Sequence, residues 1–318
     1  MREKWKIVSG STLKLIGIGA MFLDHFALAV VRRMLWTAPF GQPLEDLRRV
    51  YSLLRSVGRL GFPIFCFLLV EGFGKTKSRP KYLLRLGLFA LISEVPYDLV
   101  FSARVLEFGH QNVYFTLFLG LFALCGYLWL KEHPLPAPAR WPAWVMGVAA
   151  AGAWLTKTGW HFAKTRLLSQ LPALAGSVTA TTLCLAVCGF VAILLLCYGR
   201  FRGWSEMLDL GTDLALLFLL TFLADLLRTD YLGVGVLTIS AMYLLRRHPP
   251  ASMAGGCGVL MLKGLRELSA FWALLPAALY NGKRGLKLKY VFYIFYPAHL
   301  LLLWLVARYM GTTHLPVF

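Results

Sequence analysis

Long apolar runs separated by short basic segments make up almost the whole chain. A helix needs ~20 mostly apolar residues to cross a bilayer, so the runs predict an all-α polytopic integral membrane protein with about ten or eleven transmembrane helices. The run at 251–262 is short enough to be a re-entrant piece, and the run at 141–156 is weak. The candidate spans lie near residues 12–31, 57–74, 82–101, 112–130, 141–156, 172–198, 206–227, 230–245, 251–262, 268–280 and 290–309.

Polar side chains interrupt several of these runs where a bilayer would make them costly. Asp24 and His25 lie midway along the first run, and a buried charge of this kind is expected to face a partner or a cavity. Converting sequence position to depth gives two polar layers around one central polar cavity. One layer holds Asp24, His25, Arg59, Glu94, Asp98, Asn112, Asp230 and His299; the other holds Glu71, Lys75, Asn281, Lys283 and Arg284. Tyr114 begins its run together with Asn112 and is a further candidate polar residue.

Neighbouring residues on a helix point about 100° apart, so Asp24 and His25 do not face each other. We therefore expect His25 to take its partner from another helix and Asp24 to hold a different cation, with Arg59 as the candidate. An imidazole suits general-base chemistry near neutral pH, which makes His25 and His299 candidate bases. His25 is preferred, because its neighbour Asp24 brings a carboxylate into the same layer. The alternatives are that a histidine only ties two helices together, or that Glu94 or Asp98 is the base.

The segment Asn281–Gly285 is basic and contains glycine, as phosphate-binding loops often do. Asn281, Lys283 and Arg284, with Lys75, Tyr293 and Tyr296, are the candidates for binding a phosphate-bearing co-substrate. There is a simpler interpretation. The cations would only mark a cytoplasmic loop, and the tyrosines would pack between helices or belong to an interfacial aromatic belt.

Composition and charge fit this interpretation. The chain is 58% hydrophobic, and its mean hydropathy is +0.64. Its net charge of +18 is assigned to membrane topology and anionic lipid rather than to nucleic acid. Basic residues favour a cytoplasmic N-terminus, although the segment 32–56, expected to be an outer loop, carries five arginines. The six cysteines form no Cys-x-x-Cys pair, so neither a metal site nor a disulfide framework is expected.

Several motifs, in a fixed order, resemble the TraX family. They are Leu13–His25, Val57–Phe73, Tyr82–Leu86, Ile92–Asp98, Gln111–Leu117, Asp230–Val236, and Tyr280–Gly285 continuing to Phe292–Leu300. The middle of the chain, about 131–210, begins with a Pro-rich connector and carries none of these motifs. We therefore expect one transmembrane domain over 1–318 with inserted helices at about 131–210.

The TraX family is named for the enzyme that N-acetylates conjugative pilin, and it is similar to a wider group of membrane acyltransferases. The resemblance implies a bacterial cytoplasmic-membrane acetyltransferase that moves an acetyl group from cytoplasmic acetyl-CoA to an amine or hydroxyl acceptor. His25, Asp24 and His299 would be catalytic. The acceptor stays open, a homodimer is possible, and neither a metal nor a nucleic acid is expected.

A secondary transporter of a small polar or anionic solute is the main alternative. Such a protein is expected to have broken helices and pseudo-symmetric halves. Pro63, Pro96 and Pro297 offer possible breaks, but the sequence shows no internal repeat. A non-catalytic assembly protein would carry few ionisable residues inside its helices, unlike this chain.

Overall fold

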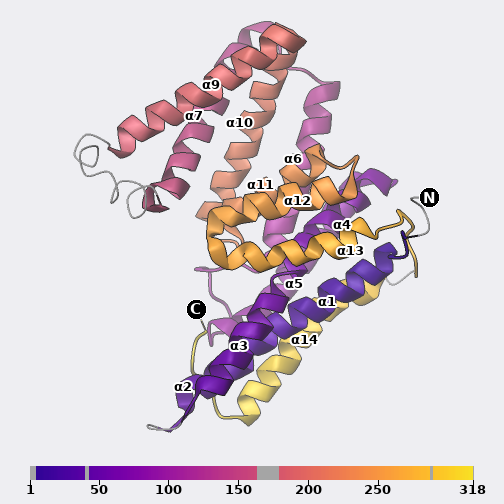
Figure 1. Ribbon diagram of the computed structural model, residues 1–318, viewed down its shortest axis with the longest axis vertical. Coiled ribbons are helices and arrows are strands. Elements are labelled where there is room, and N and C mark those ends of the chain that lie inside the picture. Colours follow the sequence, from indigo (N-terminus) through magenta and orange to yellow (C-terminus); the bar gives the residue numbers. More distant parts are fainter. Residues whose placement is uncertain (1–4, 40–42, 163–178, 287–288, 318) are drawn as a thin grey trace. The chain divides into compact units, whose positions relative to one another are not determined.

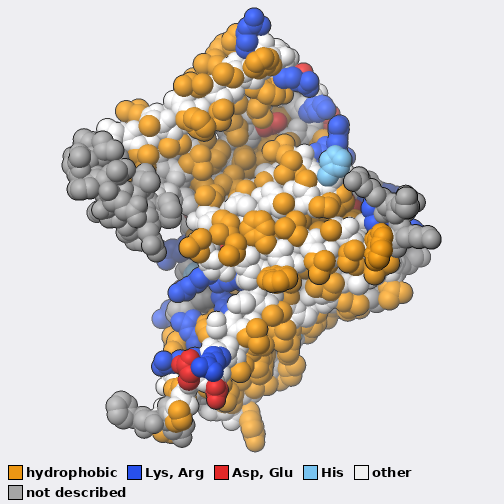
Figure 2. Space-filling model, in the orientation of Figure 1, with side chains coloured by type: hydrophobic (Ala, Val, Ile, Leu, Met, Phe, Trp, Pro, Cys, Tyr) orange, Lys and Arg blue, Asp and Glu red, His pale blue; other side chains and the backbone are white. Residues whose placement is uncertain are grey.

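The computed structural model describes residues 5–39, 43–162, 179–286 and 289–317, and these residues are predominantly helical (Figure 1). Six stretches of this part are long and apolar enough to cross a membrane: 10–37, 45–75, 113–132, 180–202, 204–226 and 290–309. Figure 2 shows hydrophobic side chains over much of the visible face, as expected of a surface that meets lipid. The predicted class, an all-α polytopic membrane protein, is confirmed.

The helices follow one another with few long connections. They are α1 (Gly10–Phe26), the π-helical η1 (Ala27–Val31), α2 (Arg32–Thr37), α3 (Glu45–Gly58), α4 (Gly61–Lys75), α5 (Arg79–Phe101), α6 (Val113–Glu132), α7 (Ala137–Phe162), α9 (Ala180–Arg202), α10 (Trp204–Leu226), α11 (Leu232–Leu244), α12 (Pro249–Leu260), the 3₁₀ helices η4 (Met261–Lys263) and η5 (Leu265–Ala273), α13 (Leu274–Ala278) and α14 (Lys289–Tyr309).

Six candidate spans in the described part are fewer than the ten or eleven expected. Three apolar runs give short elements: α11 has 13 residues, α12 has 12, and the run at 268–280 divides between η5 and α13. At 1.5 Å per residue, 13 residues extend about 20 Å, less than the ~30 Å hydrocarbon core. Helices α5 and α7 are long enough but less apolar than the six.

The segment 32–56, expected to be an outer loop, is largely helical. It contains α2 and most of α3, and α3 has Glu45 and Asp46 in its first turn and Arg55 in its last. Acidic residues at the start of a helix and basic residues at its end both favour the helix dipole. The expectation of a loop was wrong because these charges were counted as loop charges and not as one face of an amphipathic helix.

The chain folds as two compact units, one made of residues 1–121 with 227–318 and the other of 122–226. In the second unit, α7, α9 and α10 pack around Trp144, Val148, Leu195 and Met207. A β-carbon on Gly147 would collide with the Gly211 carbonyl oxygen, so this glycine allows two helices to approach closely. The segment expected to be inserted, 131–210, lies within this second unit.

In the first unit, the first and last helices of the chain lie together. Helix α1 packs against α3, α4 and α14, while α14 also packs against α5 (Figure 1). Helix α1 begins after Ser9, whose hydroxyl accepts a hydrogen bond from the Thr12 N–H. The backbone N–H groups of Gly10 and Ser11 donate to the carbonyls of Lys283 and Arg284. The start of α1 is therefore attached to the loop that precedes α14.

Arg33 is buried without a carboxylate partner among the described residues. It is 0% exposed, and its guanidinium donates to the carbonyls of Ala29 at 3.0 Å, Val100 at 2.6 Å and Leu315 at 3.0 Å. One side chain thus holds η1, the end of α5 and the C-terminal segment together.

Replacing Arg33 with Met should destabilise the protein, because buried carbonyls would lose their donor. The expected cost is about 2 kcal/mol or more, measured as a lower midpoint of thermal unfolding in detergent. The neighbouring Arg32 lies over the ring of Trp36, so Arg32→Met is the matched control and should change the midpoint much less. Equal effects of the two substitutions would contradict this role of Arg33.

Candidate functional site

The two candidate histidines, one on the first helix and one on the last, form a direct hydrogen bond. Nδ1 of His25 lies 2.7 Å from Nε2 of His299, and the two ring planes differ by only 5°. The residues are 8% and 4% exposed. Nδ1 of His299 lies 2.8 Å from the carbonyl oxygen of Phe295, one turn earlier on α14. The sequence treated these histidines as alternatives, and the structure joins them.

Both helices are locally irregular at this pair. Directly after Phe26 the helix widens into the π-helical turn η1, a feature often found at functional sites. In α14, Pro297 lacks the N–H that would bond to the carbonyl of Tyr293. Aromatic rings surround the pair: Tyr296 has its centroid 5.9 Å from that of His25, and Phe101 lies at 5.4 Å.

Asp24 pairs with Arg55 and not with Arg59. Nη1 of Arg55 lies 2.5 Å from Oδ2 of Asp24, and the two side chains are 25% and 19% exposed. A β-carbon on Gly58 would collide with the Asp24 side chain, so the glycine makes room for the carboxylate. The expected partner was wrong because Arg55 had been assigned to a loop, whereas it lies on α3 facing α1.

Arg59 instead forms an ion pair with Glu267 of η5. The Glu267 side chain is only 5% exposed, and a buried carboxylate of this kind needs its cation nearby. Sequence reasoning missed Glu267, which stands at the edge of the apolar run 268–280. The available signal was a carboxylate directly before an apolar run, where burial would require a cation partner.

Glu94 and Asn112 form a second buried polar contact. Asn112 donates to the Glu94 carboxylate from its side-chain amide and from its backbone N–H, and its amide also donates to the Ala90 carbonyl at 2.8 Å. The side-chain oxygen of Asn112 accepts from the N–H of Tyr114 at 3.0 Å. The other oxygen of Glu94 is buried and makes no hydrogen bond with the described residues.

Asp98 lies one turn beyond Glu94 on α5 and is fully buried. Its Oδ2 accepts from the backbone N–H of Glu107 at 2.7 Å, while its Oδ1 has no hydrogen-bond partner in the part of the chain that the structure describes. The Glu107 carboxylate itself accepts from Gly109 N–H and from Arg104, which lowers its pKa. Glu94 and Asp98 thus each keep one buried oxygen open for a further donor.

Asp230 lies in the turn between α10 and α11. Burial raises the pKa of its carboxyl, and the nearby charges of Lys263, His110 and Arg55 oppose that rise. Its neighbour Tyr231 stacks on Phe62, with ring centroids 3.5 Å apart. Asp230 thus contributes to the same electrostatic environment as Arg55.

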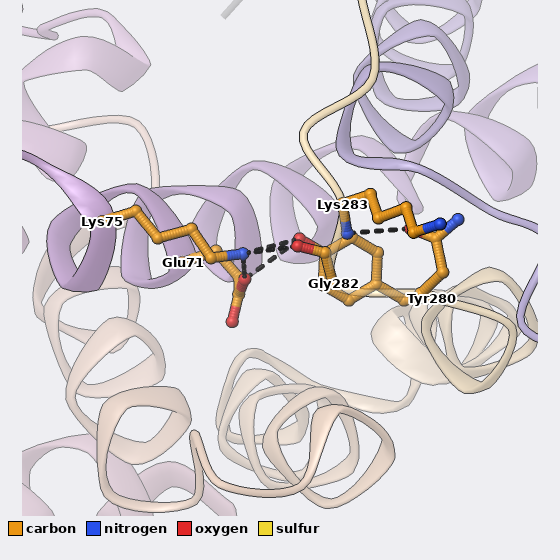
Figure 3. A network of polar contacts seen from close by, with 6 residues as sticks. Glu71, Lys75, Tyr280, Gly282 and Lys283 are labelled. Atoms are coloured by element: carbon orange, nitrogen blue, oxygen red, sulfur yellow. Dashed lines mark hydrogen bonds and ion pairs between the residues drawn. The ribbon is translucent and has the colours of Figure 1, made fainter. Parts of the chain in front are cut away.

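Residues of the second predicted layer, which holds Glu71, Lys75 and the loop 281–285, form a separate network at the end of α4 (Figure 3). Nζ of Lys75 lies 2.5 Å from the Glu71 carboxylate and donates to the Gly282 carbonyl at 2.9 Å. Burial raises the pKa of Tyr280, and its hydroxyl donates to Glu71 at 3.0 Å. Lys75, a candidate for binding the co-substrate, is thus paired with Glu71 and also holds the loop through the Gly282 carbonyl.

Lys283 and Arg284 are exposed on the loop that Lys75 supports. Asn281 accepts from the Lys283 N–H through its side-chain oxygen at 2.9 Å, which fixes the turn. By contrast, Tyr293 stacks on Phe89 at 4.8 Å, and Tyr296 lies against the histidines. The six residues expected to form one co-substrate site are therefore divided, with the two tyrosines in the histidine layer.

The two layers are well separated along α1. Ser11, which contacts the basic loop, precedes His25 by 14 residues, or about 21 Å of helix. Any molecule that uses both places must be extended.

Comparison with known proteins gives one relative and one family. Residues 9–187 and 183–307 match the family described as TraX protein. The chain is 39% identical over 123 residues to a "Probable fimbrial assembly protein FimC, serogroup H1" of Dichelobacter nodosus. That match covers 36% of this chain and 45% of the relative, so the chain aligns with less than half of the relative's length. No solved structure matches.

The family match also covers the whole middle of the chain, 131–210, in which the sequence motifs gave no resemblance. It includes both histidines of the pair and the basic loop between Tyr280 and Gly285. The chain belongs to the TraX family.

Proposed function

We propose that this protein is a membrane acetyltransferase that moves an acetyl group from acetyl-CoA to an amine or hydroxyl acceptor. The observation that carries the proposal is the buried hydrogen bond between His25 and His299. A neutral imidazole pair is suited to take a proton from an attacking nucleophile near neutral pH.

The reaction needs one proton acceptor and one leaving group. The acceptor's nitrogen or oxygen attacks the thioester carbonyl and gives its proton to the histidine pair. The carbon–sulfur bond then breaks, and the CoA thiolate takes up that proton to leave as the thiol. Acetyl-CoA and the acceptor are thereby converted to CoA and the acetylated acceptor, and the pair returns to its neutral state.

The basic loop supports binding of the donor. Lys283 and Arg284 are exposed cations, and charge-assisted contacts to phosphates are among the stronger hydrogen bonds. CoA carries its phosphates and its thioester at opposite ends of a long pantetheine arm. Such a molecule suits two places about 21 Å apart along α1. The proposal puts the loop on the cytoplasmic side of a bacterial inner membrane, with the N-terminus.

Two carboxylates support a polar acceptor. Oε1 of Glu94 and Oδ1 of Asp98 are buried without a hydrogen bond among the described residues, and an N–H or O–H of the acceptor would satisfy them. The similarity to a probable fimbrial assembly protein makes a fimbrial subunit one acceptor to test.

His25→Ala should strongly slow acetyl transfer while donor binding persists, because the base is lost and the basic loop is intact. The expected fall in rate is about 10²–10⁴-fold. Inside-out membrane vesicles that contain the protein would be incubated with radiolabelled acetyl-CoA and a fimbrial subunit, and acid-stable label on the subunit and on membrane components would be counted.

The same vesicles test the competing functions. Label that enters wild-type vesicles without becoming covalently attached would indicate a transporter. Transfer that survives in both His25→Ala and His299→Ala would contradict the histidine base and favour Glu94 or Asp98.

Replacing Lys283 and Arg284 together with Ala should weaken acetyl-CoA binding while the protein stays folded. Each charged contact is worth about 1.5–3 kcal/mol, or roughly tenfold or more in Kd. Binding of radiolabelled acetyl-CoA to protein in detergent would measure the change. Arg246 and Arg247 form another exposed basic pair, so the double Ala variant there is the control. Equal affinity of the two double variants would show that Lys283 and Arg284 serve topology alone.

A further inference from the structure

In the hydrogen bond between the two histidines, one ring must donate and the other must accept. A neutral imidazole carries one N–H donor and one nitrogen with a lone pair. The contact between Nδ1 of His25 and Nε2 of His299 at 2.7 Å therefore needs a proton on one of these two nitrogens and a lone pair on the other.

The carbonyl oxygen of Phe295 decides which nitrogen holds the proton. A carbonyl oxygen can only accept, so Nδ1 of His299, 2.8 Å away, must carry a proton. The neutral ring of His299 then has its lone pair on Nε2. It follows that Nδ1 of His25 carries the shared proton and that the lone pair of His25 is on Nε2.

We propose that His299 is a positioning residue, which holds His25 in the tautomer that presents Nε2 as the base. This inference rests on the proposed acetyl transfer. It assigns different parts to the two histidines. The lone pair of Nε2 of His299 accepts the hydrogen bond from Nδ1–H of His25, and Nε2 of His25 is left to take the acceptor's proton.

His299 has the role toward His25 that the buried aspartate has toward the catalytic histidine of a serine protease: it fixes the tautomer and the orientation of the ring. Among the described residues no carboxylate lies within ion-pair distance of either ring, and the nearby Asp24 is held by Arg55. When Nε2 of His25 takes up a proton, the Nδ1–H becomes a charged donor and its bond to His299 strengthens. The neutral imidazole of His299 thus stabilises protonated His25, and no ionised carboxylate has to be buried among the aromatic rings.

The tautomers can be observed without any activity measurement. Ring-nitrogen NMR of protein carrying isotope-labelled histidine separates N–H from bare nitrogen. The chain has seven histidines, and loss of one signal in His25→Asn and in His299→Gln assigns the pair. The expected result is a proton on Nδ1 and a bare Nε2 in both rings. A proton on Nε2 of His25 in the wild-type protein would overturn the inference.

Matched substitutions test the function of the hydrogen bond. In His299→Gln an amide oxygen can replace Nε2 as the acceptor, whereas His299→Leu fills similar space with no acceptor. We expect kcat within about tenfold of wild type for Gln and a fall of about 10²-fold or more for Leu, with KM for acetyl-CoA unchanged.

His25→Asn completes the series. Its amide N–H can replace Nδ1 and keep the bond to His299, but no atom replaces Nε2, so transfer should be lost in a folded protein. Equal loss of kcat in the Gln and Leu variants of His299 would show that His299 contributes packing and not a hydrogen-bond acceptor. Absence of transfer by the wild-type protein would refute the proposed function itself, and a wild-type protein that transfers acetyl with a proton on Nε2 of His25 would refute only this inference.

Discussion

Polar side chains inside a bilayer have to find their hydrogen-bonding partners within the protein, because hydrocarbon offers none. In the first unit those partners come from helices far apart in sequence. The bonds His25–His299, Asp24–Arg55 and Arg59–Glu267 connect α1 with α14, α1 with α3, and the end of α3 with η5. The residues that are most costly to bury thus determine which helices meet, and the apolar surfaces fill the space between them.

This dependence explains what the sequence could and could not predict. The positions of His25, His299 and Glu94 were predictable, since each stands out in an apolar run and converts directly to depth. Their partners were not, because sequence gives the height of a residue on its helix but not the direction of the neighbouring helix. Arg55 was missed for a different reason: its segment has enough charge to be interpreted as a loop although it is an amphipathic helix. The elements α11, α12 and η5 are shorter than the spans expected from their apolar runs, because apolar composition alone does not set the length of a helix.

Five basic residues described above fall into three physical classes that a count of charges does not separate. Arg33 is solvated by backbone carbonyls, Arg55 and Arg59 are matched by carboxylates, and Lys283 and Arg284 remain exposed. Only the third class behaves as loop charge toward lipid or phosphate. Two of the five arginines in 32–56 therefore carry little weight in an argument about membrane orientation.

The histidine pair joins residues separated by 274 positions, with the whole second unit between them in sequence. At 5–20 residues per second, the ribosome needs about 14–55 s to proceed from His25 to His299. During that interval the first helix has to reside in the membrane with an imidazole that lacks its final partner. The site is completed only when the last helix inserts. A chain truncated or stalled before α14 would therefore have most of its helices in the membrane but no histidine pair.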